Sequence, residues 1–296
     1  MSHKTMTRAF RDTTVRDRAG GAVPLGLLSV PHMRNRTRVT TIVGLAAAFV
    51  VAVGGPLVSA NADSYGERLV ITEGGTPDHP KVFHGNGEHV DGITVEADNV
   101  VVDGYVADHP EAPGVEITGS NITVQNVTIS EPHGGDGDGI RFFGDHLKIL
   151  DNTVDKTSND NGHADCMQTF ADDTPASHDV LIEGNHCKQI DNMCVMAEGP
   201  NDGEGDGNGH TYNVTIRKNF CETLEASQNL MFEDVQNATI SDNQFTGNTD
   251  HAIGLAIGST GARVSGNTLD DGIECEVGID ESSREGYQGP EPECEP

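Results

Sequence analysis

Beyond residue 62, apolar and polar residues alternate with a period of two over short segments such as 121–125 and 213–217. This alternation is typical of short β-strands that bury one face. Glycine and asparagine separate the segments, and this part of the chain contains no apolar stripe with helical spacing. The pattern therefore predicts an all-β protein built from many short strands.

A four-residue phrase recurs along the chain: a β-branched residue, two further residues, then asparagine. Spacings of 33, 34, 24 and 24 residues separate its asparagines, which are Asn152, Asn185, Asn219, Asn243 and Asn267. Shortened forms end at Asn126 and Gly104. The unit is thus 22–24 residues long, with insertions of about ten residues before Asn185 and Asn219. A fixed period of this length indicates stacked repeats.

Short strands, turn residues and a period of one coil predict a single-stranded, right-handed parallel β-helix with about seven or eight coils. Over residues 66–272 the chain resembles the right-handed parallel β-helix family, the pectate-lyase-like superfamily. We expect the repeat asparagines to occupy bends with positive φ and to form hydrogen-bonded ladders. The residues two positions later should stack in one buried column: Val154, Cys187, Cys221, Phe245 and Leu269.

The first 62 residues have the features of a leader. Basic residues at 34–38 precede an apolar and glycine run at 42–53, and a small-x-small signal follows at 60–62. We predict a signal peptide over 33–62 that is cut before Asp63, and therefore a secreted, extracellular protein. An uncut membrane anchor is the alternative, because the apolar stretch is nearly long enough to span a bilayer. We interpret residues 1–32 as a candidate mis-annotated extension, 63–272 as the β-helix and 273–296 as an acidic C-terminal tail.

Charge is distributed unevenly. Of the 18 basic and 47 acidic residues, eight and two lie in 1–62, which leaves ten and 45 in residues 63–296, a net charge of −35. This balance excludes nucleic-acid binding through phosphates, which depends on Lys and Arg, and excludes an anionic membrane surface. Charge of this density is associated with halophilic proteins; an ordinary acidic secreted protein is the alternative.

All six cysteines lie beyond the leader, as disulfides in an oxidising compartment require. Neighbouring strands lie about 4.8 Å apart, inside the Cα separation that a disulfide accepts. Stacking the repeats then pairs the cysteines as Cys166–Cys194, Cys187–Cys221 and Cys275–Cys294. A ladder of buried free thiols is the alternative.

Chemistry-bearing residues concentrate between 133 and 234. Aligning 138–141 (DGIR) with 165–168 (DCMQ) puts Asp138 beside Asp165 and Arg141 beside Gln168 on adjacent coils. We expect the two carboxylates on one external face about 5 Å apart. They then need a cation between them or a shared proton. Both uses stay open: a Ca²⁺ site from Asp136, Asp138 and Asp165, or an acid–base pair.

The remaining catalytic candidates surround this pair. His163 has a titration range suited to proton transfer. The resemblance to β-helix polysaccharide lyases implies an Arg or Lys base, with Ca²⁺ neutralising the substrate carboxylate. The candidate catalytic residues are His163, Asp165, Gln168, Arg141 and Lys188. Glu198 and Glu233 are second-tier candidates, and residues 201–210 are either a Ca²⁺ loop or a flexible insertion.

We therefore predict a secreted carbohydrate-active β-helix protein, in the first place a polysaccharide lyase with its groove over residues 136–198. Its partner would be an extracellular polysaccharide, its cofactor Ca²⁺, and its state a monomer without nucleic-acid or membrane partners. Two alternatives remain: a glycoside hydrolase that uses stacked carboxylates, and a non-catalytic surface β-helix that binds glycan or calcium. An enzyme would need the two insertions to wall a cleft over Asp138 and Asp165.

Overall fold

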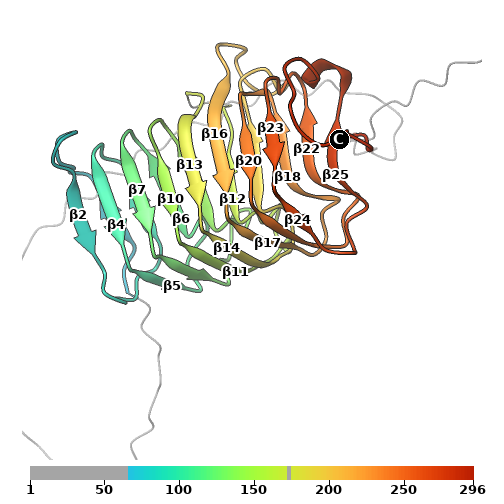
Figure 1. Ribbon diagram of the computed structural model, residues 1–296. Helices are drawn as coiled ribbons and strands as arrows, with labels where there is room; N and C mark the ends of the chain where they lie inside the picture. The colour runs from blue at the N-terminus through green and yellow to red at the C-terminus, as the bar shows by residue number, and fades with distance from the viewer. Residues whose placement is uncertain (1–65, 172–174) are drawn as a thin grey trace, which may run out of the picture. The chain divides into compact units, whose positions relative to one another are not determined.

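The computed structural model describes residues 66–171 and 175–296. The predicted extension, signal peptide and cleavage site lie outside these residues. In the described residues the 25 strands pair in parallel and form three long sheets, as Figure 1 shows. No helix of the described residues is long and apolar enough to cross a membrane.

Sheet 1 has nine strands, which follow one another along the β-helix. They are β1 (Leu69–Ile71), β3 (Ile93–Val95), β6 (Val115–Thr118), β9 (Ile140–Phe143), β12 (Met167–Thr169), β15 (Val195–Glu198), β18 (Gln228–Glu233), β22 (His251–Ala256) and β25 (Cys275–Ile279).

Sheet 2 has eight strands in one row and β19 (Val235–Gln236) beside β16. The row is β2 (Lys81–His84), β4 (Val100–Asp103), β7 (Ile122–Gln125), β10 (Lys148–Leu150), β13 (His178–Glu183), β16 (Thr211–Arg217), β20 (Thr239–Ser241) and β23 (Arg263–Ser265). Sheet 3 has seven strands: β5 (Val106–Asp108), β8 (Thr128–Ser130), β11 (Thr153–Thr157), β14 (His186–Ile190), β17 (Phe220–Thr223), β21 (Gln244–Gly247) and β24 (Thr268–Leu269).

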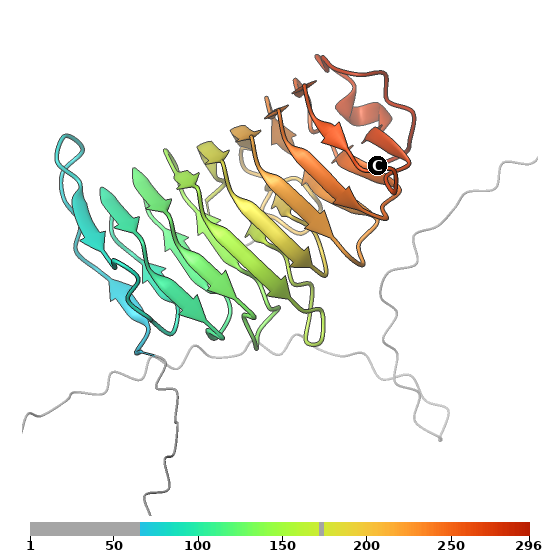
Figure 2. The same cartoon turned by 60° about the horizontal axis from the view of Figure 1, so that its bottom comes forward.

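The chain visits sheet 2, sheet 3 and sheet 1 in turn, and each circuit is one coil. The stacked coils form a right-handed parallel β-helix whose colours run from one end to the other in Figures 1 and 2. Eight strands in the row of sheet 2 correspond to eight coils, as the repeat predicts. The fold class is therefore confirmed.

Apolar side chains fill the interior in stacked columns. In sheet 3, Val154 pairs with Cys187, Cys187 with Cys221, Cys221 with Phe245, and Phe245 with Leu269. The first four side chains are buried and Leu269 is partly buried against them. This confirms the predicted column, and with it the repeat alignment.

The repeat asparagines form a ladder between sheets 2 and 3. The side-chain amide of each donates to Oδ1 of the next, 3.0 Å away, from Asn152 to Asn267. The same Oδ1 atoms accept backbone N–H groups at 2.8–3.0 Å. The expectation of positive φ at these asparagines is wrong: the residue before each one adopts it, for example Asp151 at 52°. Asn126 stands level with Asp151, so the ladder begins only at Asn152.

The disulfides follow a different pairing from the predicted one. They are Cys166–Cys187, Cys194–Cys221 and Cys275–Cys294. Only the last was predicted correctly. Cysteines in register on neighbouring parallel strands, such as Cys187 and Cys221, point the same way, so their Cβ atoms stay about 4.8 Å apart. A disulfide needs a Cβ–Cβ distance of about 3.8 Å. Cys166 instead enters the interior from the turn before β12 and meets Cys187 on the next coil.

Residues 273–296, assigned above to a tail, lie against the last coil. β25 extends sheet 1 past residue 272, and Cys294 is bridged to it through Gly278. Tyr287 packs against the core and its hydroxyl donates to the carbonyl of Pro290 at 2.7 Å. The segment therefore covers the C-terminal end of the β-helix.

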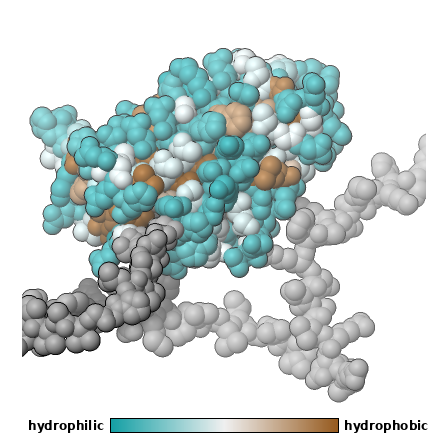
Figure 3. Space-filling model, turned by 90° about the horizontal axis from the view of Figure 1, so that it is seen from below, coloured by the Kyte–Doolittle hydropathy of each residue, from teal (hydrophilic) through white to brown (hydrophobic). Residues whose placement is uncertain are grey.

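The surface is mainly hydrophilic. Figure 3 views the molecule from below, the side of sheet 3 in Figure 1, and shows scattered hydrophobic residues among hydrophilic ones. The large hydrophobic residues most exposed among those described are Val70, Val82 and Leu224. The apolar residues of the repeat thus fill the inside of the coils.

Candidate functional site

The outer face of sheet 1 carries the predicted pair Arg141 and Gln168 in register on β9 and β12. Asp138 and Asp165 lie in the turns that lead into these strands. Gly137, with φ of 86°, allows the turn that holds Asp136 and Asp138, and a Cβ at this glycine would stand 2.9 Å from the carbonyl oxygen of Ser158. The sequence alignment of the two coils is therefore correct.

Asp138 and Asp165 are buried, which corrects the prediction that they project from an external face. Oδ1 of Asp138 accepts the backbone N–H of Asp165 at 2.8 Å. Oδ1 of Asp165 in turn accepts the backbone N–H of Met193 and the amide of Asn192, both at 2.9 Å. The carboxylates therefore connect three successive coils, because each satisfies a backbone donor of the next turn that would otherwise be buried without a partner.

Arg141 supplies the positive charge beside these acids. Its Nε donates to Asp138 at 2.5 Å and a terminal nitrogen donates to Asp136 at 2.6 Å. Burial lowers the pKa of Arg141, but the charges of Asp138 and Asp136 and their hydrogen bonds outweigh it and raise the pKa overall. A Ca²⁺ ion held by Asp136, Asp138 and Asp165 does not fit, since the guanidinium already occupies the place between Asp136 and Asp138.

Asp165 has an unusual electrostatic environment. Burial, and then the charge of Asp138, raise the pKa of Asp165 well above its ordinary value. Burial also raises the pKa of Asp138, against the opposing effect of Arg141. Oδ2 of Asp165 is buried and has no hydrogen-bond partner among residues 66–171 and 175–296. The Asp165 carboxyl therefore keeps its proton to a higher pH than a solvated aspartate.

The other predicted residues separate into two groups. His163 is exposed in the loop 158–164, which lies against Asp136. Gln168 faces outward beside Arg141, and its Oε1 has no hydrogen-bond partner within the described part of the chain. Lys188 lies in β14, paired with Asp155 on sheet 3. Its inclusion in the site is wrong. Lys188 follows Asp165 by nearly one full coil of the chain, which places it on sheet 3 and not beside the turns that carry Asp138 and Asp165.

Glu198 and Glu233 form a second carboxylate pair on the same outer face. They stand opposite one another at the ends of β15 and β18. Carboxylate oxygens of Glu198, Asp202 and Glu233 all lie within 4.8 Å of one another. Burial, followed by the charges of Asp202, Glu233 and Glu204, raises the pKa of Glu198 to about 7. A carboxyl group with a raised pKa beside a second carboxyl group is an arrangement that acid–base chemistry uses.

Aromatic residues lie between the two acid clusters. Phe143 and Phe170, at corresponding positions of successive coils, pack edge to face with ring centroids 4.8 Å apart. The Arg141 guanidinium lies 5.6 Å from the centroid of Phe170. Phe170 is level with Glu198 on the next strand, so an apolar ring lies beside the Glu198–Glu233 pair.

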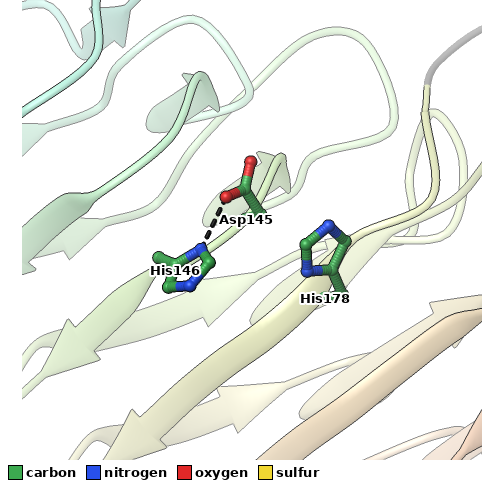
Figure 4. Close-up of side chains that lie close together, drawn as sticks. All are labelled: Asp145, His146 and His178. Carbon is green, nitrogen blue, oxygen red and sulfur yellow. Dashed lines mark hydrogen bonds and ion pairs between the residues drawn. The ribbon is translucent and has the colours of Figure 1, made fainter.

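A groove of about 730 Å³ lies on the outer face of sheet 2, where the sequence predicted no site. Lys148, Arg217 and Arg263 are among its lining residues. At its edge, Asp145 and His146 approach His178 of the next coil, as Figure 4 shows; Nδ1 of His146 is 2.6 Å from Asp145.

The spacing of the repeat could have indicated the cluster of Asp145, His146 and His178. The spacing of 33 residues between Asp145 and His178 is the same as that between Asn152 and Asn185. Asp202 belongs to the segment 201–210, for which the sequence left a Ca²⁺ loop or a flexible insertion open. No repeat position determines the conformation of this segment, so its approach to Glu198 was not predicted. Asp138 and Asp165 are buried, so they do not face a cleft that the two insertions could wall.

No protein-family model matches this chain, and no curated protein matches it. Among solved structures it is similar to the tailspike protein of E. coli bacteriophage HK620 in complex with pentasaccharide, with a TM-score of 0.39 and 11% identity over 74% of this chain and 53% of that one. It is also similar to PfbA, a surface adhesin of Streptococcus pneumoniae, with a TM-score of 0.33 and 13% identity over 63% and 61%. The chain thus spans less than two thirds of either structure.

Proposed function

We propose that this protein is a secreted carbohydrate-active enzyme that hydrolyses glycosidic bonds on the outer face of sheet 1. The observation that carries the proposal is the Glu198–Glu233 pair, in register on neighbouring strands, with the pKa of Glu198 raised to about 7. A carboxyl group that is still protonated near neutral pH can donate to a leaving oxygen, while its partner acts as carboxylate.

The geometry suggests how the two residues divide the work. Their nearest carboxylate oxygens lie within 4.8 Å, closer to the spacing of about 5–5.5 Å in retaining enzymes than to the 6.5–9.5 Å of inverting ones. Glu198 would protonate the glycosidic oxygen while Glu233 attacks the anomeric carbon. Glu198 would then take a proton from the water that releases the sugar from Glu233, which preserves the anomeric configuration.

The substrate class follows from charge and surroundings. A net charge of −35 over residues 63–296 repels polyuronates at low ionic strength, which favours an uncharged extracellular glycan. Phe170 offers an apolar ring beside the acids, and Arg141 covers part of it. Three disulfides suit an oxidising, extracellular compartment.

A polysaccharide lyase is the second candidate, and the Arg141–Gln168 neighbourhood favours it. In that chemistry a base removes the proton α to a uronate carboxylate. Arg141 is held by two carboxylates and Lys188 lies on sheet 3, so His163 would have to act as the base. Membership of the pectate-lyase-like superfamily belongs to this proposal.

A panel of neutral and uronic polysaccharides, assayed at low and high salt, separates the candidates. Hydrolysis produces reducing ends without absorbance at 235 nm, and β-elimination produces both. We expect Glu198→Gln and Glu233→Gln each to lower activity at least about 100-fold, with Glu183→Gln on sheet 2 as the matched control. Activity that is retained in both variants refutes the assignment; activity lost with EDTA instead indicates Ca²⁺ at Glu198, Asp202 and Glu233.

A further inference from the structure

Sulfur is concentrated on the outer side of sheet 1. Four methionines follow residue 62, and only Met167 points into the core. Met196 and Met231 pair in register on β15 and β18, and Met193 lies in the turn before β15. Nε2 of Gln228 donates to the Met193 sulfur at 3.6 Å. Met196 and Met231 therefore lie side by side on the outer face of sheet 1.

His251 opens the next strand, β22, and is 3% exposed. Neither of its ring nitrogens has a hydrogen-bond partner in the part of the chain that the structure describes. Buried polar groups are nearly always partnered, so two unpartnered nitrogens in one ring call for an explanation. Burial lowers the pKa of His251, against the opposing charge of Asp250.

Gly254 brings the sulfur and the imidazole together. It pairs with Met231 across β18 and β22. A Cβ built on Gly254 would stand 2.6 Å from the Met231 sulfur and 3.0 Å from Nε2 of His251. Any larger residue would therefore push both groups away, whereas glycine lets a thioether and an unpartnered imidazole nitrogen converge on one point.

We propose that His251, Met231 and Met196 bind a monovalent copper ion. Thioethers are soft ligands that select Cu(I), and a neutral imidazole is a good copper ligand, whereas Ca²⁺ and Mg²⁺ prefer oxygen. Met196 can supply the third ligand because its unbranched side chain adapts easily and it stands beside Met231. Coordination by Nε2 provides the partner that this nitrogen lacks. The site lies beyond the proposed hydrolysis and does not depend on it.

The test uses the purified full chain with its disulfides intact. Cu(I), kept reduced with ascorbate without oxygen, is titrated in competition with the chromophoric chelator bicinchoninate. We expect one tightly bound ion per chain and sulfur and nitrogen neighbours in X-ray absorption spectra. Loss of an outer-shell partner already costs about 10–100-fold in metal affinity, so Met231→Leu and His251→Ala should each cost at least about 100-fold.

Met167→Leu is the matched control, since it exchanges the same atoms in the core and should bind copper like the unchanged chain. Circular dichroism and thermal unfolding without copper verify that each variant folds. Equal affinity of Met231→Leu and Met167→Leu overturns the proposal. So does a failure of the unchanged chain to take Cu(I) from the chelator. If His251→Ala does not fold, Met231→Leu alone decides.

Discussion

The backbone N–H of Asp165 donates a 2.8 Å hydrogen bond to Oδ1 of Asp138 on the preceding coil. Asp165 repeats the arrangement with Met193 one coil further on. Two carboxyl groups that the sequence marks as reactive are thus also structural connections between turns. Because they are buried, the free energy of unfolding depends on whether Asp165 carries a proton.

The first prediction concerns pH and Asp165. Its pKa in the folded protein is well above the ordinary value of 3.8, so the folded state keeps a proton that the unfolded chain has lost. The free energy of unfolding should therefore fall as pH rises from 3.8 towards the folded pKa, by at most about 1.4 kcal/mol per pH unit from this group. Urea unfolding at several pH values should show a flatter dependence in Asp165→Asn. Asp160→Asn, an exposed change in the nearby loop, should leave the dependence as it is.

The second prediction concerns the asparagine ladder. Asn185 accepts the backbone N–H and the side-chain amide of Asn152, and donates to Asn219. Asn185→Ala leaves buried groups unpaired on both neighbouring coils and should cost about 2–4 kcal/mol in unfolding free energy. Asn248→Ala, an exposed position outside the ladder, should change it by less than about 0.5 kcal/mol. Similar losses in both variants would show that the ladder adds no stability of its own.

The third prediction concerns the pH profile of hydrolysis. If Glu198 is the general acid, activity should decline as pH rises through about 7. Asp202→Asn removes the largest charge effect that raises the pKa of Glu198. The alkaline limb of the profile, where activity declines, should therefore move to lower pH. Asp206→Asn, in the same loop, is the control and should leave the limb in place. An unchanged limb in Asp202→Asn would contradict the assignment of Glu198.

The fourth prediction concerns disulfide connectivity. Proteolysis under non-reducing conditions and mass spectrometry should find peptides that join Cys166 to Cys187 and Cys194 to Cys221. Replacing Cys166 and Cys187 together by alanine should cost about 2–4 kcal/mol, because the bridge closes a loop of 21 residues. Peptides that join Cys187 to Cys221 would contradict this connectivity and support the pairing of cysteines in register.

The fifth prediction concerns salt. Ten basic residues face 45 acidic ones beyond residue 62, and their repulsion is screened over about 3 Å at 1 M salt and about 10 Å at 0.1 M. Thermal unfolding between about 0.05 M and 2 M NaCl should therefore show a rising Tm. A constant Tm over this range would contradict the halophilic interpretation.

The sequence by itself determined the fold and its register. A β-helix stacks equivalent positions at a fixed period, so the spacing of Asn152, Asn185 and Asn219 already specifies which residues lie side by side. The column from Val154 to Leu269 and the pairing of Arg141 with Gln168 follow from the same alignment.

The tertiary structure decided what the repeat does not encode. Which way a turn residue points depends on the loops that cover it, so the burial of Asp138 and Asp165 was not predictable. Side chains that converge from different sheets, such as Cys166 before β12 and Cys187 on β14, are brought together by packing inside the β-helix. Asp202 reaches Glu198 from an insertion. One-dimensional order thus determines neighbours within a sheet, and three-dimensional packing determines neighbours between sheets and loops.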